Sequence, residues 1–76
     1  MNIFQELDRI KSKGVSVTIR WGRSVRFIGP MLYNGRDGRG KHTVNFSRLM
    51  KKEDKDFEST IYNAIIDFDE KHPEYL

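Results

Sequence analysis

Residues 15–21 read Val15-Ser16-Val17-Thr18-Ile19-Arg20-Trp21, and this strict alternation of apolar and polar side chains decides the fold. Successive side chains of a β-strand point to opposite faces, so one face of this segment is apolar and the other carries hydroxyls and a guanidinium. The pattern predicts a half-buried strand. We therefore expect the rest of the chain to cover one face of the sheet and to leave the other face open.

Two further strands are expected after this segment. Gly22-Arg23 should form a tight turn into residues 24–28, and Gly29-Pro30 should bulge or kink that strand before residues 31–33. Residues 34–40 are typical of a turn or a flexible hairpin tip. Alternation resumes over residues 42–47, which predicts the third strand.

A helix is expected on each side of the strands. Asn2 can cap the first helix and Gly14 can end it. The second helix should begin near residues 53–54 and end at residue 71, before Pro73. The apolar side chains expected to face the core are Ile3, Leu7 and Ile10 in the first helix and Phe57, Ile61, Ala64, Ile65 and Phe68 in the second.

The predicted fold is therefore α+β: a helix, a three-stranded antiparallel meander sheet and a second helix, with both helices on one face. A chain of 76 residues has room for one modest core, so residues 1–76 are expected to form a single domain. Hydrophobic residues make up 37% and charged residues 33% of the chain, which is typical of a globular protein rather than a disordered one.

The absence of cysteine excludes disulfides and metal sites built on thiolates. A reducing cytoplasm is therefore the expected location. The first residues contain an acid and no apolar run, so neither a signal peptide nor a membrane span is expected there. Neither a metal nor a cofactor is predicted.

Charge is segregated along the chain. The net charge is +3, but residues 20–52 hold nine basic residues against Asp37 alone and so carry +8. Residues 53–76 hold two lysines against eight acids and carry −6. Two surfaces of opposite potential are expected, and the basic one is the better candidate for binding an anionic partner. The predicted anion- or partner-binding residues are Arg20, Arg23, Arg26, Arg36, Arg39, Lys41, Arg48, Lys51 and Lys52.

The open sheet face should combine these cations with short polar side chains. Hydroxyls and amides beside guanidinium groups suit phosphate or carboxylate oxygens, because arginine offers a planar bidentate fork. The alternative is an ordinary solvated face of an antiparallel sheet, which often carries the same residue types. The residues expected on this face are Ser16, Thr18, Arg20, Ser24, Arg26, Thr43, Asn45 and Ser47.

Catalysis is not expected. The two histidines, His42 and His72, have no neighbours typical of a catalytic triad or a metal site, and the chain has no cysteine and no Gly-x-Ser-x-Gly elbow. Trp21 and Phe46 share the apolar strand face, so we expect both in the core rather than on a platform for stacked bases.

Two apolar residues of the second helix lie off its core stripe. Tyr62 and Ile66 point away from Phe57 and Phe68, so a cover is expected from Tyr75 and Leu76 or from a second copy of the chain. A homodimer through Tyr62 and Ile66 is the favoured prediction.

The order helix, three strands, helix resembles that of double-stranded RNA-binding domains, and Lys51-Lys52-Glu53-Asp54-Lys55 is similar to the basic cluster at the start of that family's second helix. The resemblance implies that Lys51, Lys52 and Lys55 contact phosphates across a major groove.

Met1-Asn2-Ile3, Ile10-Lys11 and Lys13, followed by three strands and an acidic last helix, resemble small phage-encoded inhibitors of CRISPR nucleases. The resemblance implies a non-enzymatic phage or mobile-element accessory protein that inhibits or regulates a host nucleic-acid-handling complex. The alternatives are a direct nucleic-acid-binding regulator and a protein that sequesters a nucleotide signal. Nucleic acid or a nucleic-acid-binding host complex is therefore the expected partner, and no membrane is expected.

Overall fold

A computed structural model describes residues 2–30, 32–33, 36–37 and 43–76 of the chain. It confirms the predicted α+β order of a helix, a three-stranded antiparallel sheet and a helix. The elements in chain order are α1 (Ile3–Ser12), β1 (Ser16–Arg20), β2 (Ser24–Pro30), β3 (Leu32–Tyr33), β4 (Arg36–Asp37), β5 (Thr43–Leu49), α2 (Phe57–Lys71) and the 3₁₀-helix η1 (Pro73–Tyr75).

The three-stranded sheet has the order β1-β2-β5, so β2 is central and antiparallel to both neighbours. The bulge that was one expectation at Gly29-Pro30 does not occur, because β2 stays in register with β5 through both residues and pairs Gly29 with Val44. A Cβ on Gly29 would lie 2.9 Å from Val15 Cγ2, so the glycine permits close approach rather than a bulge. β3 and β4 form a separate two-stranded sheet.

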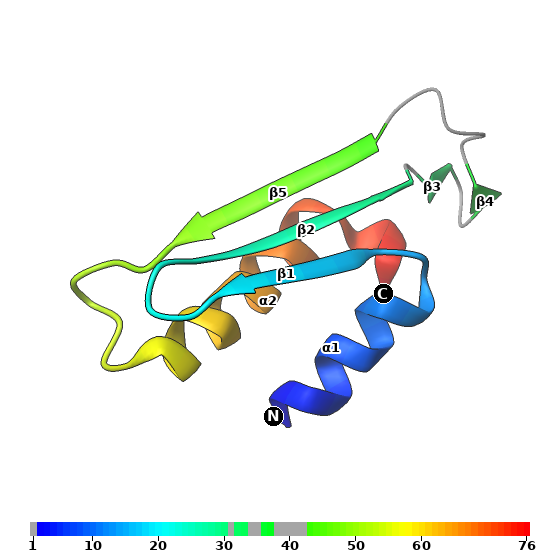
Figure 1. Cartoon of the computed structure of the whole chain (residues 1–76). Helices are drawn as coiled ribbons and strands as arrows, with labels where there is room; N and C mark the ends of the chain where they lie inside the picture. The colour runs from blue at the N-terminus through cyan, green and yellow to red at the C-terminus, as the bar shows by residue number, and fades with distance from the viewer. Residues whose placement is uncertain (1, 31, 34–35, 38–42) are drawn as a thin grey trace.

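Both helices lie on the same side of the three-stranded sheet (Figure 1). The core between these layers includes Val25 and Phe27 of β2, and the ring of Phe68 in α2 lies 4.9 Å from that of Phe27. All five residues predicted for the core stripe of α2 are buried. The full set of buried apolar residues is Leu7, Ile10, Val15, Val25, Phe27, Val44, Phe57, Ile61, Ala64, Ile65, Phe68 and Tyr75.

The first helix has the predicted ends. Asn2 Oδ1 accepts hydrogen bonds from the backbone N–H groups of Phe4 and Gln5, at 3.0 and 3.2 Å. Gly14 follows the helix with φ 86°, a conformation that favours glycine. Arg9 then ties α1 to the end of the chain, because its Nη2 contacts Asp69 Oδ2 at 2.8 Å and its Nη1 donates to the Tyr75 carbonyl at 3.2 Å.

The second helix begins at Phe57, three or four residues later than predicted. Asp56 caps it, accepting a hydrogen bond from the Ser59 N–H at 2.8 Å, which lowers the pKa of the Asp56 carboxyl. The earlier acid, Asp54, has its side chain buried in the preceding loop and is used there as an acceptor. Arg48 engages the Asp54 carboxylate in the loop, and Asp56 caps the helix instead.

The core position expected for Trp21 is also wrong. Trp21 is 70% exposed, because it lies in the turn beyond the last residue of β1, where the sheet no longer has a neighbour to cover it. Its ring lies 4.8 Å from that of the core residue Phe57. Phe46 is partly buried against the core, as predicted.

Candidate anion-binding surface

Seven of the eight residues predicted for the open sheet face lie on it, and the side chain of the eighth, Thr43, lies outside the described residues. The strand register places Thr18 of β1 and Ser47 of β5 directly opposite Arg26 of the central strand. None of the side chains described on this face is acidic or aromatic. They are Ser16, Thr18, Arg20, Ser24, Arg26, Ile28, Asn45, Ser47 and Leu49.

Two of these side chains are apolar and were not expected on this face. Ile28 lies on this face because it is two residues beyond Arg26 in β2. Leu49 lies on it because β5 extends past its predicted end at residue 47. Leu49 is 68% exposed. The open face therefore offers aliphatic contacts beside its cations and hydroxyls.

A hollow of about 100 Å³ lies between the two arginines of this face. Register places Arg20 opposite Ser24 and Thr18 opposite Arg26, so each guanidinium has a hydroxyl on the neighbouring strand. All four side chains line this hollow. Guanidinium and hydroxyl groups both donate hydrogen bonds, which suits the oxygens of a phosphate.

Three further cations lie at the same end of the sheet. The turn between β1 and β2 is closed by a hydrogen bond from Arg23 N–H to the Arg20 carbonyl at 2.8 Å, and Gly22 has φ 81° within it. The Met50 N–H donates to the Arg23 carbonyl at 2.8 Å, so the loop after β5 lies beside this turn. We name the resulting basic sheet-end surface by its cations, which are Arg20, Arg23, Arg26, Lys51 and Lys52.

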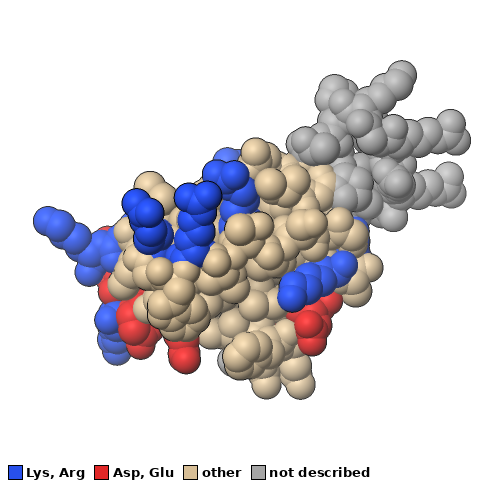
Figure 2. All heavy atoms as spheres, in the orientation of Figure 1, with Lys and Arg blue, Asp and Glu red and all other residues tan. Residues whose placement is uncertain are grey.

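The charges of the basic sheet-end surface are available to a partner. All five side chains are exposed, and within the described ranges no ion pair engages any of them. Figure 2 shows Lys and Arg atoms gathered over the upper left of the molecule, where Figure 1 places the turn end of the sheet, with Asp and Glu atoms below them. This separation leaves a positive field at the end of the open face.

Arg48 does not belong to this surface, which corrects its predicted role in anion binding. It lies opposite Val25 on the core face of the sheet and is only 8% exposed. Its Nη1 contacts Asp54 Oδ2 at 2.8 Å and its Nε contacts Asp67 Oδ2 at 3.3 Å. The alternation of β5 could have predicted this position, because Arg48 shares the core face of the strand with residues 44 and 46.

The buried Asp54 carboxylate fixes the loop that carries Lys51 and Lys52. Besides Arg48, it accepts hydrogen bonds from the Lys51 N–H at 2.9 Å, Thr60 Oγ1 at 2.9 Å and Asn63 Nδ2 at 3.0 Å. The bonds from Arg48 and then from the Lys51 backbone hold the pKa of Asp54 well below its usual range. This network links β5, the loop and α2, and so sets where the two lysines lie.

The other predicted cations are not brought into this surface. The backbone of Arg36 lies in β4, at the opposite end of the sheet from the β1–β2 turn (Figure 1). Arg39, Lys41 and His42 lie outside the described residues, as does the side chain of Arg36. His72 is described: its Nδ1 lies 3.2 Å from Glu74 Oε1, and its ring packs 5.3 Å from that of Phe68.

The residues predicted for self-association remain partly exposed. Tyr62 is exposed and Ile66 is intermediate. Tyr75 is buried with its ring 5.4 Å from that of Phe68, while Leu76 is 65% exposed. The homodimer stays a prediction.

Comparison with models of protein families, with curated proteins and with solved structures finds no match for this chain. No cluster of His, Asp and Glu suited to a metal ion occurs among residues 2–30, 32–33, 36–37 and 43–76. Across that same part of the chain, no helix is long and apolar enough to cross a membrane.

Proposed function

We propose that this protein binds the phosphate backbone of a double-stranded nucleic acid through its basic sheet-end surface, without catalysis. The observation that carries the proposal is the pairing of Arg20 and Arg26 with strand-opposed hydroxyls around one hollow, with no ion pair to either arginine among the described residues. Arginine fits phosphate oxygens with two parallel hydrogen bonds and loses less on partial desolvation than lysine does.

The composition of the open face favours the backbone over the bases. Proteins that bind single strands stack bases on aromatic rings, and none of the described side chains on this face is aromatic. Phosphate contacts position a protein on a duplex without reading its sequence. We therefore expect similar affinities for duplexes of different sequence.

Charge reversal tests the surface directly. The double variant Arg20→Glu/Arg26→Glu should raise the Kd for a fluorescein-labelled 20-base-pair duplex about tenfold or more, because both phosphate contacts are lost and like charges replace them. Fluorescence anisotropy at fixed salt measures the change, with RNA and DNA duplexes as separate arms. The melting temperature should hardly move, because both side chains are exposed.

The matched control is Lys13→Glu/Lys71→Glu, which makes the same change in net charge at two exposed lysines outside the surface. It should alter the Kd only a few-fold, through the long-range field. Equal losses in the two double variants would show that net charge alone governs binding, and the proposed surface would then be wrong.

A wider role in inhibiting or regulating a nucleic-acid-handling complex also needs a surface for a protein. The basic sheet-end surface alone does not require one. An apolar groove on the helix side of the sheet offers such a surface.

A further inference from the structure

An apolar groove runs between α1, the edge strand β1 and the start of α2, on the helix side of the sheet. It includes a hollow of about 380 Å³ whose floor contains Leu7 and Ile61, both from the core. Two large aromatic side chains stand at its margin: Phe4 is 79% exposed and Trp21 is 70% exposed. The residues that line this hollow are Asn2, Ile3, Phe4, Leu7, Ile19, Trp21, Glu58 and Ile61.

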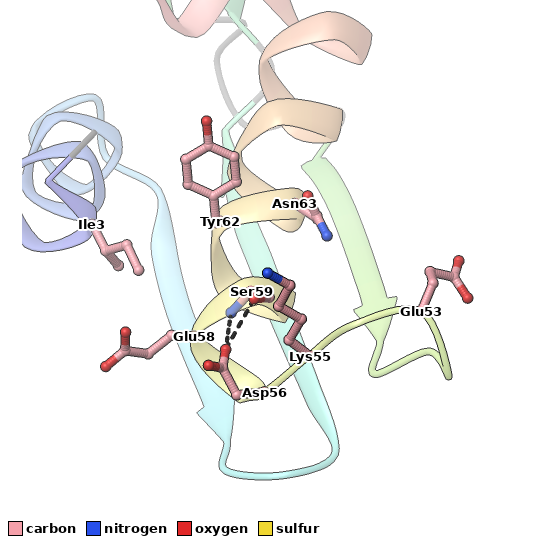
Figure 3. A pocket seen from close by; sticks show the side chains of 8 residues that line it. All are labelled: Ile3, Glu53, Lys55, Asp56, Glu58, Ser59, Tyr62 and Asn63. Carbon is pink, nitrogen blue, oxygen red and sulfur yellow. Dashed lines mark hydrogen bonds between the residues drawn. The ribbon is translucent and has the colours of Figure 1, made fainter.

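A second hollow, of about 410 Å³, continues the groove along the start of α2 and shares Ile3 and Glu58 with the first. Figure 3 shows its lining spread from Ile3 of α1 at the left, past Glu58 and Tyr62 of α2, to Glu53 at the right. Asp56 lies at its lower end, held to Ser59 by the hydrogen bonds that cap α2. The two hollows together form the helix-side groove.

Carboxylates dominate the charge of this groove. Its lining contains Glu53, Asp56 and Glu58 against Lys55 alone, a balance of −2. Glu53 and Glu58 are exposed and make no ion pair with any described residue. Asp56 stays ionised, because the Ser59 N–H lowers its pKa.

The groove is held in shape from several sides. Arg9 bridges α1 to Asp69 of α2, and the ring of Trp21 rests 4.8 Å from that of Phe57. A Trp21 ring that already contacts Phe57 has less conformational freedom to lose when a partner covers it. An apolar floor with exposed aromatic residues and a charged margin is the usual anatomy of a protein-binding surface.

We propose that the helix-side groove docks a basic amphipathic segment of a protein partner, whose apolar face covers Phe4, Trp21 and Ile61 and whose Lys or Arg side chains meet Glu58 and its neighbours. Charge complementarity selects this occupant, because the lining holds Glu53, Asp56 and Glu58 against Lys55 alone. Basic segments are typical of proteins that handle nucleic acids. The proposal goes beyond nucleic-acid binding and does not depend on it.

The test uses the one tryptophan of the chain as its probe, since Trp21 lines the groove. An 18-residue amphipathic peptide of Leu and Lys should shift the emission of Trp21 to shorter wavelength as the indole leaves water. A matched Leu/Glu peptide and a scrambled Leu/Lys peptide should bind at least about tenfold more weakly, because they lack charge complementarity and an apolar face respectively.

Substitutions at two exposed positions distinguish binding in the groove from nonspecific apolar binding. Phe4→Ser should weaken the Leu/Lys peptide about tenfold, and Glu58→Lys should weaken it several-fold while improving the Leu/Glu peptide. Leu76→Ser, at an exposed apolar residue outside the groove, should change neither, and Arg20→Glu/Arg26→Glu, on the basic sheet-end surface, should not weaken the Leu/Lys peptide. Circular dichroism confirms that each variant is folded.

Three results would overturn the proposal: no spectral shift with the Leu/Lys peptide, equal binding of the scrambled peptide, or unchanged binding in Phe4→Ser. A fourth is a wild-type dimer in sedimentation that Phe4→Ser converts to monomer, because a second copy would then be the occupant. Loss of duplex binding in Arg20→Glu/Arg26→Glu with intact peptide binding would separate this groove from the proposed nucleic-acid surface.

Discussion

Asp54 shows how one buried side chain positions others that face solvent. Its two oxygens receive hydrogen bonds from Arg48, Thr60, Asn63 and the Lys51 backbone, so a β-strand, a loop and a helix meet at one carboxylate. A buried charge is tolerated only when all of its hydrogen-bonding and charged partners are present. Removing one member of a buried ion pair leaves the other member buried without a partner. Asp54 and Arg48 are therefore structural, although their residue types alone would also suit a surface site.

Asp54→Asn should lower the melting temperature by roughly 10 °C or more, because the Arg48 guanidinium would remain buried beside a neutral amide. Thermal unfolding followed by circular dichroism measures this, with Glu53→Gln at an exposed neighbouring acid as the control that should stay close to wild type.

Asp54 also makes the stability of the protein depend on pH. The folded-state pKa of Asp54 is lowered, so its contribution to stability is present above the unfolded value of about 4 and is lost as the pH falls below it. The wild-type melting temperature should thus decrease as the pH is lowered below about 4. The melting temperature of Asp54→Asn should decrease less steeply over the same pH range. An equally steep decrease of the melting temperature in the two proteins would contradict the assigned role of Asp54.

At the scale of elements, Gly29 lets β2 lie against the start of β1. A side chain there would approach not only Val15 Cγ2 but also the Val15 Cα, at 3.0 Å, and a backbone atom cannot rotate away. Gly29→Ala should therefore cost about 1–3 kcal/mol of unfolding free energy by overpacking. Urea denaturation measures it, and Ser47→Ala on the open face of β5 serves as the control. A variant as stable as wild type would show that the start of β1 can move away from the added Cβ at no cost in stability.

Periodicity predicted the elements better than it predicted their ends. The alternation of residues 15–21 correctly assigned Val15 and Val17 to the core side and Thr18 and Arg20 to the open face. It failed at Trp21, because alternation states which way a side chain points and not whether anything covers it. The start of α2 was missed for a similar reason: Asp54 and Asp56 look alike as caps until the tertiary partner Arg48 is known.

The candidate surface was predictable in part. Arg20, Arg23 and Arg26 follow from local sequence, since one turn joins their strands. That Lys51 and Lys52 lie beside them depends on the Met50–Arg23 hydrogen bond, a long-range contact with no sequence signal. The helix-side groove was not predicted at all, because it arises from three elements that meet only in the folded chain.

The whole molecule separates two kinds of surface across one thin core. Among the described residues, the open face of the sheet and its turn end carry cations that make no ion pair, while the helix side combines an apolar floor with carboxylates. If both proposals hold, the protein binds a nucleic acid and a basic protein segment at once.

The salt dependence of duplex binding tests the central claim most directly. If Arg20, Arg23, Arg26, Lys51 and Lys52 all neutralise phosphates, log K against log of the salt concentration should fall with a slope of about −4.5 on B-DNA, and Arg26→Ala should reduce its magnitude by about 1. A slope near zero, or one that Arg26→Ala leaves unchanged, would contradict phosphate binding by this surface.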